Sequence, residues 1–142
     1  MTETAAITVP SDPRYLAVIR ELTAAMAGAW GMSDAGKDDV KLAVDEACAN
    51  VIKHAYRGDV SGRIVVKYFP GASFEVVIED DGIKARPENI RGRDLDDVRP
   101  GGLGIHFIKR TFDVFKFDGR KKKGNRLRLV RHRRAEDADQ GR

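Results

Sequence analysis

The stretch DEACANVIKHAY, residues 45–56, carries three polar side chains on one side of a predicted helix. Glu46 and Asn50 are four residues apart, which places them about 40° apart around the helix axis, and Lys53 falls on the same side. This side borders the apolar stripe of the helix, where solvated side chains are not usually found, and asparagine has a poor helix propensity. The apolar stripe consists of Val40, Ala43, Val44, Ala47, Val51 and Ala55. We therefore consider a binding or catalytic role for the three polar residues.

These side chains could act together on a nucleoside triphosphate. An asparagine carbonyl is the kind of oxygen ligand that Mg²⁺ prefers. A carboxylate one turn away could accept a proton from a hydroxyl group or water that attacks the γ-phosphate, and Lys53 could neutralise phosphate charge. Alternatively, Glu46 is an exposed helix residue that pairs with Lys53 or Arg20, and this helix taken alone favours that simpler interpretation.

A second motif lies at the end of a predicted strand in FEVVIEDDGI, residues 74–83. The strand ends in Asp80-Asp81-Gly82, where a glycine would allow a ligand to approach the backbone. A carboxylate in this place could accept a hydrogen bond from an amino group such as N6 of adenine. An ordinary Asp-Gly turn explains the same residues, because such turns are common.

A third motif, GGLGI at residues 101–105, directly precedes a predicted helix. Exposed N–H groups at a helix start can hold an anion such as a phosphate, although a flexible turn would also use glycine. Residues 81–100, just before it, form a long polar segment of the kind that is usually functional or mobile in a small domain. The three motifs together, in this order, are much more specific than any one of them.

In this order the motifs resemble those of the histidine-kinase-type ATPases of the Bergerat (GHKL) fold, and most of all those of the bacterial anti-sigma factor serine/threonine kinases. The N box of that family is matched by E-x-x-x-N at residues 46–50 with His-Ala-Tyr at residues 54–56. Its G1 box is matched by D-x-G at residues 80–82, and its G2 box by residues 102–105. The resemblance covers nearly the whole chain. Lys84 departs from it, since many members have a second glycine there.

The resemblance implies a role for each matched residue. Glu46 would be the general base, Asn50 the Mg²⁺ ligand and Asp80 the carboxylate that reads adenine. Gly102 and Gly104 would wrap the phosphates beneath a lid. The residues expected to bind ATP are Asn50, Lys53, Asp80, Gly82, Gly101, Gly102, Leu103, Gly104 and Ile105.

The same resemblance implies partners and a regulatory function. Such proteins bind an RNA polymerase sigma factor as a homodimer and phosphorylate a serine or threonine of a small anti-anti-sigma protein of the STAS type, in the regulation of transcription under stress. A second possibility is a module that binds ATP and sequesters a partner without transferring phosphate, but Glu46 favours the kinase, because sequestration needs no base. A third is a basic domain that binds nucleic acid through residues 120–134. We do not expect direct nucleic-acid binding, because no aromatic residues are interleaved there for base stacking.

The composition is that of an ordinary soluble domain. The chain has 142 residues, 42% hydrophobic and 34% charged, with a formal net charge of +4. No apolar run approaches the roughly 20 residues that span a bilayer, so we expect no membrane association. A single cysteine, Cys48, and an N-terminus without signal-peptide features lead us to expect a cytoplasmic protein.

Hydrophobic periodicity predicts the element order β-α-α-β-β-loop-α-β-β. The predicted strands cover residues 4–9, 63–69, 74–79, 114–117 and 126–130, and the predicted helices run from 13 to about 28, from 34 to about 56, and from 103 to 111. This order indicates an α+β two-layer sandwich, with a mixed, mostly antiparallel sheet, helices on one face and a lid over ATP. We expect one ATPase domain over residues 1–132 and a disordered tail over residues 133–142.

Overall fold

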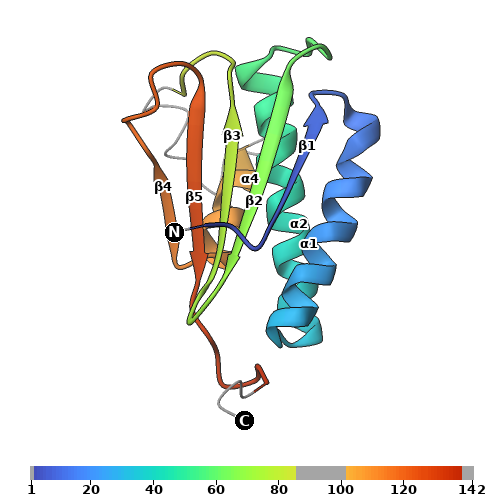
Figure 1. Ribbon diagram of the computed structural model, residues 1–142, viewed down its shortest axis with the longest axis vertical. Helices are drawn as coiled ribbons and strands as arrows, with labels where there is room; N and C mark the ends of the chain where they lie inside the picture. The colour runs from blue at the N-terminus through green and yellow to red at the C-terminus, as the bar shows by residue number, and fades with distance from the viewer. Residues whose placement is uncertain (1, 86–101, 139–142) are drawn as a thin grey trace.

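The computed structural model describes residues 2–85 and 102–138, in which helices cover one face of a five-stranded sheet (Figure 1). Gly101 and the predicted lid from residue 86 onward lie outside the described residues. The elements are β1 (Ala5–Pro10), the 3₁₀ turn η1 (Pro13–Tyr15), α1 (Leu16–Trp30), α2 (Asp34–Asn50), the π-helical turn η2 (Val51–Ala55), β2 (Arg63–Pro70), β3 (Phe74–Asp80), α4 (Gly102–Thr111), β4 (Val114–Phe117) and β5 (Asn125–Arg131). This is the predicted α+β order.

The sheet has the strand order β1-β2-β3-β5-β4. We expected a mixed sheet, but every pairing among the described strands is antiparallel. The central strand β3 lies between β2 and β5, and its last residue, Asp80, is opposite Ile64 on one side and Asn125 on the other. This register brings the start of the last strand to the D-x-G motif.

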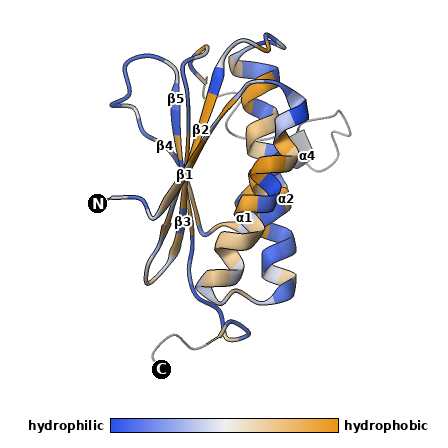
Figure 2. Cartoon of the chain, turned by 45° about the vertical axis from the view of Figure 1, so that its right-hand side comes forward, coloured by the Kyte–Doolittle hydropathy of each residue, from blue (hydrophilic) through white to orange (hydrophobic). Residues whose placement is uncertain are grey.

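The core lies between the sheet and the helices, which Figure 2 shows as two layers. Alternate residues of the central strands face the helices, as the period of a half-buried strand requires. These include Ile64, Val66, Tyr68, Val76, Ile78 and Leu129, each at most 1% exposed. Full burial of such side chains contributes about 1.5–3 kcal/mol each. The polar group of Tyr68 is satisfied, since its hydroxyl forms a 2.6 Å hydrogen bond with that of Thr23.

The helix boundaries follow local signals that the sequence carries. Asp12 caps η1 by accepting a hydrogen bond from the backbone N–H of Arg14, and Ser33 caps α2 by accepting one from that of Gly36 at 3.1 Å. Helix α1 ends where Gly31 adopts a left-handed conformation with φ of 94°. Such a C-terminal glycine avoids the strain that a side chain would meet in this conformation.

One boundary differs from the prediction. The second helix does not continue as a regular α-helix to Tyr56, because α2 ends at Asn50 and η2 forms a wider π-helical turn. The backbone N–H of Tyr56 donates to the carbonyl of Val51 at 3.0 Å, which is the i→i−5 pattern of such a turn. The carbonyl of Ala55, at the end of η2, accepts a 2.8 Å hydrogen bond from the N–H of Ile83. The end of this helix is thus joined to the D-x-G turn.

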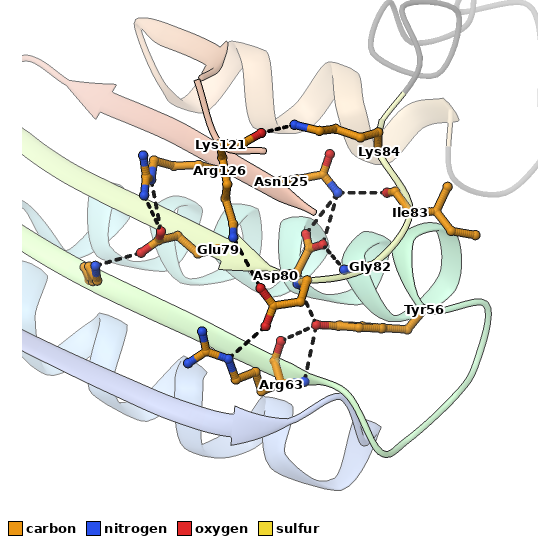
Figure 3. Close-up of polar contacts among 12 residues, drawn as sticks. Tyr56, Arg63, Glu79, Asp80, Gly82, Ile83, Lys84, Lys121, Asn125 and Arg126 are labelled. Carbon is orange, nitrogen blue, oxygen red and sulfur yellow. Dashed lines mark hydrogen bonds and ion pairs between the residues drawn. The ribbon is translucent and has the colours of Figure 1, made fainter. Parts of the chain in front are cut away.

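Tyr56 strengthens that junction (Figure 3). Its hydroxyl accepts a 2.8 Å hydrogen bond from the backbone N–H of Asp81 and donates one of 2.6 Å to the carbonyl of Arg63. A Cβ at Gly62 would overlap the Tyr56 ring, so the glycine lets the chain pass close beneath it. The aromatic side chain therefore connects η2 to the start of β2 and the end of β3.

Residues 133–138 pack against the turn between α1 and α2. The guanidinium of Arg133 lies 3.6 Å from the centroid of the Trp30 ring, the carboxylate of Asp137 accepts a 3.0 Å hydrogen bond from the N–H of Ser33, and the N–H of Ala138 donates to the carbonyl of Gly31 at 2.7 Å. A free tail would make no such contacts. The expected disorder from residue 139 onward falls outside the described residues.

Among the described residues, the helices are all too short or too polar to cross a bilayer.

Replacing Gly124 by alanine should destabilise the protein by about 2 kcal/mol or more, because the residue has φ of 72° and a Cβ there would overlap the backbone carbonyl of Asp80. The matched control is Gly119→Ala, since an added Cβ at that position meets no atom within 4 Å. Urea denaturation measures both variants. Equal stability of the two would show that the close approach of β5 to β3 is not the constraint described here.

Candidate functional site

The best-defined group of the site is the carboxylate of Asp80, at the end of β3 (Figure 3). The residue is only 3% exposed. Its Oδ1 accepts hydrogen bonds from the N–H of Gly82 at 2.8 Å and from Nδ2 of Asn125 at 3.1 Å. Burial raises the pKa of Asp80 above its ordinary value, and the hydrogen bonds from Gly82 and Asn125 oppose that rise. A held, buried carboxylate of this kind is suited to accept a hydrogen bond from an amino group of a ligand.

The neighbouring Asp81 has a different environment. Its carboxylate forms ion pairs with Arg63 at 2.9 Å and with Lys121 at 3.2 Å. The hydrogen bond from Arg63 lowers the pKa of Asp81. Asp81 is therefore already paired with cations, whereas Asp80 points into the protein. The sequence motif alone could not show this difference between the two carboxylates, and the role of Asp80 toward adenine remains a prediction.

Asn125 is a site residue that motif matching missed. Its Nδ2 also donates to the carbonyl of Ile83 at 2.9 Å, and its Oδ1 accepts from the N–H of Ala85 at 2.7 Å. One amide thus holds both the Asp80 carboxylate and the segment that follows the D-x-G turn. In the sequence it is an unremarkable asparagine at the start of the last strand, and only the β3–β5 register brings it to Asp80.

Lys84 occupies the position at which the sequence departs from the family pattern. Its Nζ donates to the backbone carbonyl of Lys121, in the loop between β4 and β5. The segment after Gly82 is therefore attached to β5 through Asn125 and to the preceding loop through Lys84. These contacts hold a backbone that has lost the second glycine of the family motif.

A close contact that the sequence did not reveal explains why residue 82 is a glycine. We expected this glycine to let a ligand approach, but a Cβ there would overlap the backbone carbonyl of Ala55. The close neighbour among the described residues is therefore the end of η2. Because Ile83 donates to that same carbonyl, Gly82 brings the Asp80 end of the sheet against the helix that carries Glu46 and Asn50.

Glu46 lies on α2 and faces the start of α4. The residue is half-buried, and a Cβ built on Gly104 would overlap its Oε2 and lie 3.4 Å from its Cδ. The alternative pairing with Arg20 is not observed, because Arg20 pairs with Asp45 at 2.8 Å. The acid of the E-x-x-x-N motif and the G-x-G motif, which are far apart in the sequence, are therefore in contact.

Asn50 and Lys53 lie between the two ends of this site along the helix. Asn50 is the half-buried last residue of α2, one turn after Glu46. Lys53 is exposed on η2. Their predicted roles toward metal and phosphate remain predictions.

The structure describes part of the G2 motif. Gly102 is the first residue of α4 and Leu103 the second; Gly101 and the surroundings of Gly102 and Leu103 lie outside what the structure describes. Gly104 and Ile105 complete the first turn, and Ile105 is half-buried and packs against the core. The N-terminal turn of α4 thus contacts Glu46 through Gly104, while Ile105 attaches it to the interior.

Among the described residues, Asn50 is the candidate ligand for a divalent cation. Within residues 2–85 and 102–138, no three His, Cys, Asp or Glu side chains gather to hold a metal. One amide oxygen from Asn50, completed by phosphate oxygens and waters, matches the preference of Mg²⁺ for oxygen ligands and retained water. The donor set fits a cation that arrives with a nucleotide.

Sequence comparisons agree with this arrangement. The model of the family described as histidine kinase-like ATPase domain matches residues 9–131. The serine-protein kinase RsbW of Listeria monocytogenes is 32% identical over 117 residues, which cover 76% of this chain and 74% of that protein. The serine-protein kinase RsbW of Bacillus cereus is 27% identical over 113 residues, which cover 74% of this chain and 71% of that protein.

Solved structures show the same fold at lower identity. The RsbU and RsbW domains of Rv1364c from Mycobacterium tuberculosis superpose with a TM-score of 0.63 at 17% identity, covering 90% of this chain and 31% of that one. This chain therefore spans about a third of that longer protein. The histidine kinase domain of the blue-light activated histidine kinase from Erythrobacter litoralis superposes with a TM-score of 0.51 at 17% identity, covering 85% of this chain and 60% of that one.

The family match extends from the last residues of β1 to the end of β5 and thus includes every element that contributes to the site. The identity to the Listeria kinase likewise extends over most of both chains. This chain belongs to the histidine kinase-like ATPase domain family, and within that family to the anti-sigma factor kinases of the RsbW type.

Proposed function

We propose that this chain is an ATP-dependent anti-sigma factor, which binds an RNA polymerase sigma factor and phosphorylates a serine or threonine of a STAS-type anti-anti-sigma protein. The observation that carries the proposal is the order of groups along α2 and η2. Gly82 and Ile83, which follow Asp80, meet this helix at Ala55, and Gly104 meets it at Glu46. Asn50 lies between these two levels.

The spacing of these levels suits a nucleoside triphosphate. Ala55 is nine positions after Glu46, which corresponds to a distance of about 13 Å along the helix. This is comparable with the length of an extended nucleoside triphosphate. Adenine at Asp80 would leave the terminal phosphate near Glu46 and Gly104, and the intermediate phosphates near Asn50.

Each residue would then have a distinct task. Asp80 would accept a hydrogen bond from the adenine amino group, and Asn50 would supply one oxygen ligand to Mg²⁺, which when bound would neutralise part of the phosphate charge. Glu46 would accept the proton of the attacking serine or threonine hydroxyl while the oxygen of that hydroxyl forms a bond to the γ-phosphorus. The bond from that phosphorus to the bridging oxygen breaks, and ADP leaves.

The partners in this proposal are supported by the family. Relatives named serine-protein kinase RsbW favour transfer to serine or threonine, and the half-buried carboxylate beside the phosphate end supports catalysis over simple sequestration. The homodimer expected from the resemblance remains a prediction.

The direct test incubates the purified chain with Mg²⁺ and γ-labelled ATP in the presence of a STAS-type protein from the same organism. Binding of ATP without any transfer of label would favour the sequestering module instead.

Glu46→Gln should lower the rate of phosphate transfer by roughly 10²–10⁴-fold, the usual contribution of a general base. The affinity for ATP should remain nearly the same, because the carboxylate acts mainly in the transition state. Transfer kinetics and calorimetry measure the two effects. A loss of ATP affinity as large as the loss in rate would contradict the assignment of Glu46 as the base.

Asp80→Asn should weaken the binding of ATP by about 10- to 100-fold, which corresponds to the loss of a hydrogen bond to a charged group. The binding of GTP, which lacks the adenine amino group, should change much less. Calorimetric titration with both nucleotides checks the prediction. An equal loss for both would show that Asp80 does not contact adenine.

Asn50→Ala should weaken the binding of ATP in the presence of Mg²⁺ and leave the weaker metal-free binding nearly unchanged, because the amide oxygen would act through the cation. The measurement is nucleotide affinity with Mg²⁺ and with EDTA. If the increase in affinity caused by Mg²⁺ is the same in the variant and the wild type, Asn50 is not a metal ligand.

A further inference from the structure

Gly104 lacks a side chain at the place where Glu46 lies. A Cβ built on Gly104 would overlap Oε2 of Glu46, and the next nearest atoms are Cδ at 3.4 Å and Cγ at 3.9 Å of the same side chain. The three nearest atoms within 4 Å thus all belong to Glu46. The space beside Gly104 is filled by the carboxylate that we propose as the base.

Two other glycines of the site, Gly82 and Gly124, differ from Gly104 in this respect. A Cβ at Gly82 would overlap the backbone carbonyl of Ala55, and one at Gly124 would overlap that of Asp80. Those glycines are needed by the fold, because backbone cannot move aside without disturbing a helix or strand. At Gly104 the obstacle is the far end of a flexible side chain, which can rotate away. The fold would therefore tolerate a side chain at residue 104, but the carboxylate of Glu46 would not keep its place.

Helix formation does not explain a glycine at this position. Gly104 is the third residue of α4 (Gly102–Thr111), and it is not among the glycines with positive φ. Alanine is the best helix former and glycine one of the worst. A glycine retained inside a regular helical turn, against this preference, needs a reason outside the helix.

We propose that Gly104 is a positioning residue, whose missing side chain leaves the space in which Glu46 holds the orientation needed to accept the hydroxyl proton. This inference rests on the proposed function, and for Gly104 it replaces the phosphate-wrapping role that the resemblance implies. Phosphate wrapping by the glycines would act on nucleotide affinity. The space that Gly104 leaves for Glu46 would instead affect the rate of phosphate transfer, since displacing a reacting group by about 1 Å can lower a rate by about 100-fold.

The test compares Gly104→Ala, Glu46→Asp and the double variant, with Gly119→Ala as a control that adds the same methyl group where no atom lies within 4 Å. Transfer of label from γ-labelled Mg²⁺-ATP to a STAS-type protein gives the rate, and calorimetry with Mg²⁺-ATP gives the affinity. Gly104→Ala should lower the rate by roughly 30- to 100-fold, with an affinity within about 3-fold of the wild type. Gly119→Ala should change neither.

The double variant shows whether Gly104 provides space for Glu46 or wraps the phosphates. Aspartate is one methylene shorter, so its carboxylate is withdrawn from residue 104. Gly104→Ala should therefore cost less than about 3-fold in rate when residue 46 is aspartate, because interacting sites are not additive. An equal cost in both backgrounds, or a loss of ATP affinity that accounts for the loss in rate, would overturn the inference in favour of phosphate wrapping.

A crystal structure of the nucleotide-free Gly104→Ala variant tests the inference without any phosphotransfer. The backbone of α4 should be unchanged, and the carboxylate of Glu46 should be displaced from its wild-type position. A carboxylate that stays in place while α4 shifts would overturn the inference. A wild-type protein that neither binds nor turns over ATP would instead refute the proposed function, and this structural result would remain interpretable.

Discussion

The contact between the carbonyl of Ala55 and the N–H of Ile83 is the interaction on which the rest of the site depends. It joins the end of a helix to the end of the central strand, at the π-helical turn that follows Asn50. The contact at this wider turn holds the helix in one position against the sheet, and therefore sets the distance between Asp80 and Glu46.

Three close approaches of the backbone maintain this relation. Gly62 passes beneath the Tyr56 ring, Gly82 lies against the carbonyl of Ala55, and Gly124 lies against that of Asp80. Each removes a side chain where two elements meet, so that short hydrogen bonds can form between them. Asn125 and Tyr56 then satisfy the polar groups that such a junction leaves at the strand ends. The result is a carboxylate of Asp80 that is held in place by several partners, in agreement with the general requirement that a functional group be held by a second layer of contacts.

Much of the fold could be predicted because its signals are local. The cap at Ser33, the left-handed glycine at Gly31 and the alternation in β5 are each visible within a few residues. The π-helical turn was missed, because it is joined to Ile83, a residue far along the chain that local sequence patterns do not report. The motifs identified Glu46, Asn50 and Asp80, and the structure brings the first into contact with the G2 turn. Asn125 could not be found from the sequence, since its role arises from strand register, and the reason for Gly82 is likewise a tertiary contact.

A crystal structure with Mg²⁺ and a non-hydrolysable ATP analogue tests the central claim most directly, because the claim concerns the direction of the nucleotide along one helix. The account predicts that N6 of adenine donates a hydrogen bond to Asp80, that the metal is bound at the level of Asn50, and that the γ-phosphate lies beside Glu46 and the first turn of α4. A nucleotide bound in the reverse direction, or bound away from α2 and η2, would contradict it.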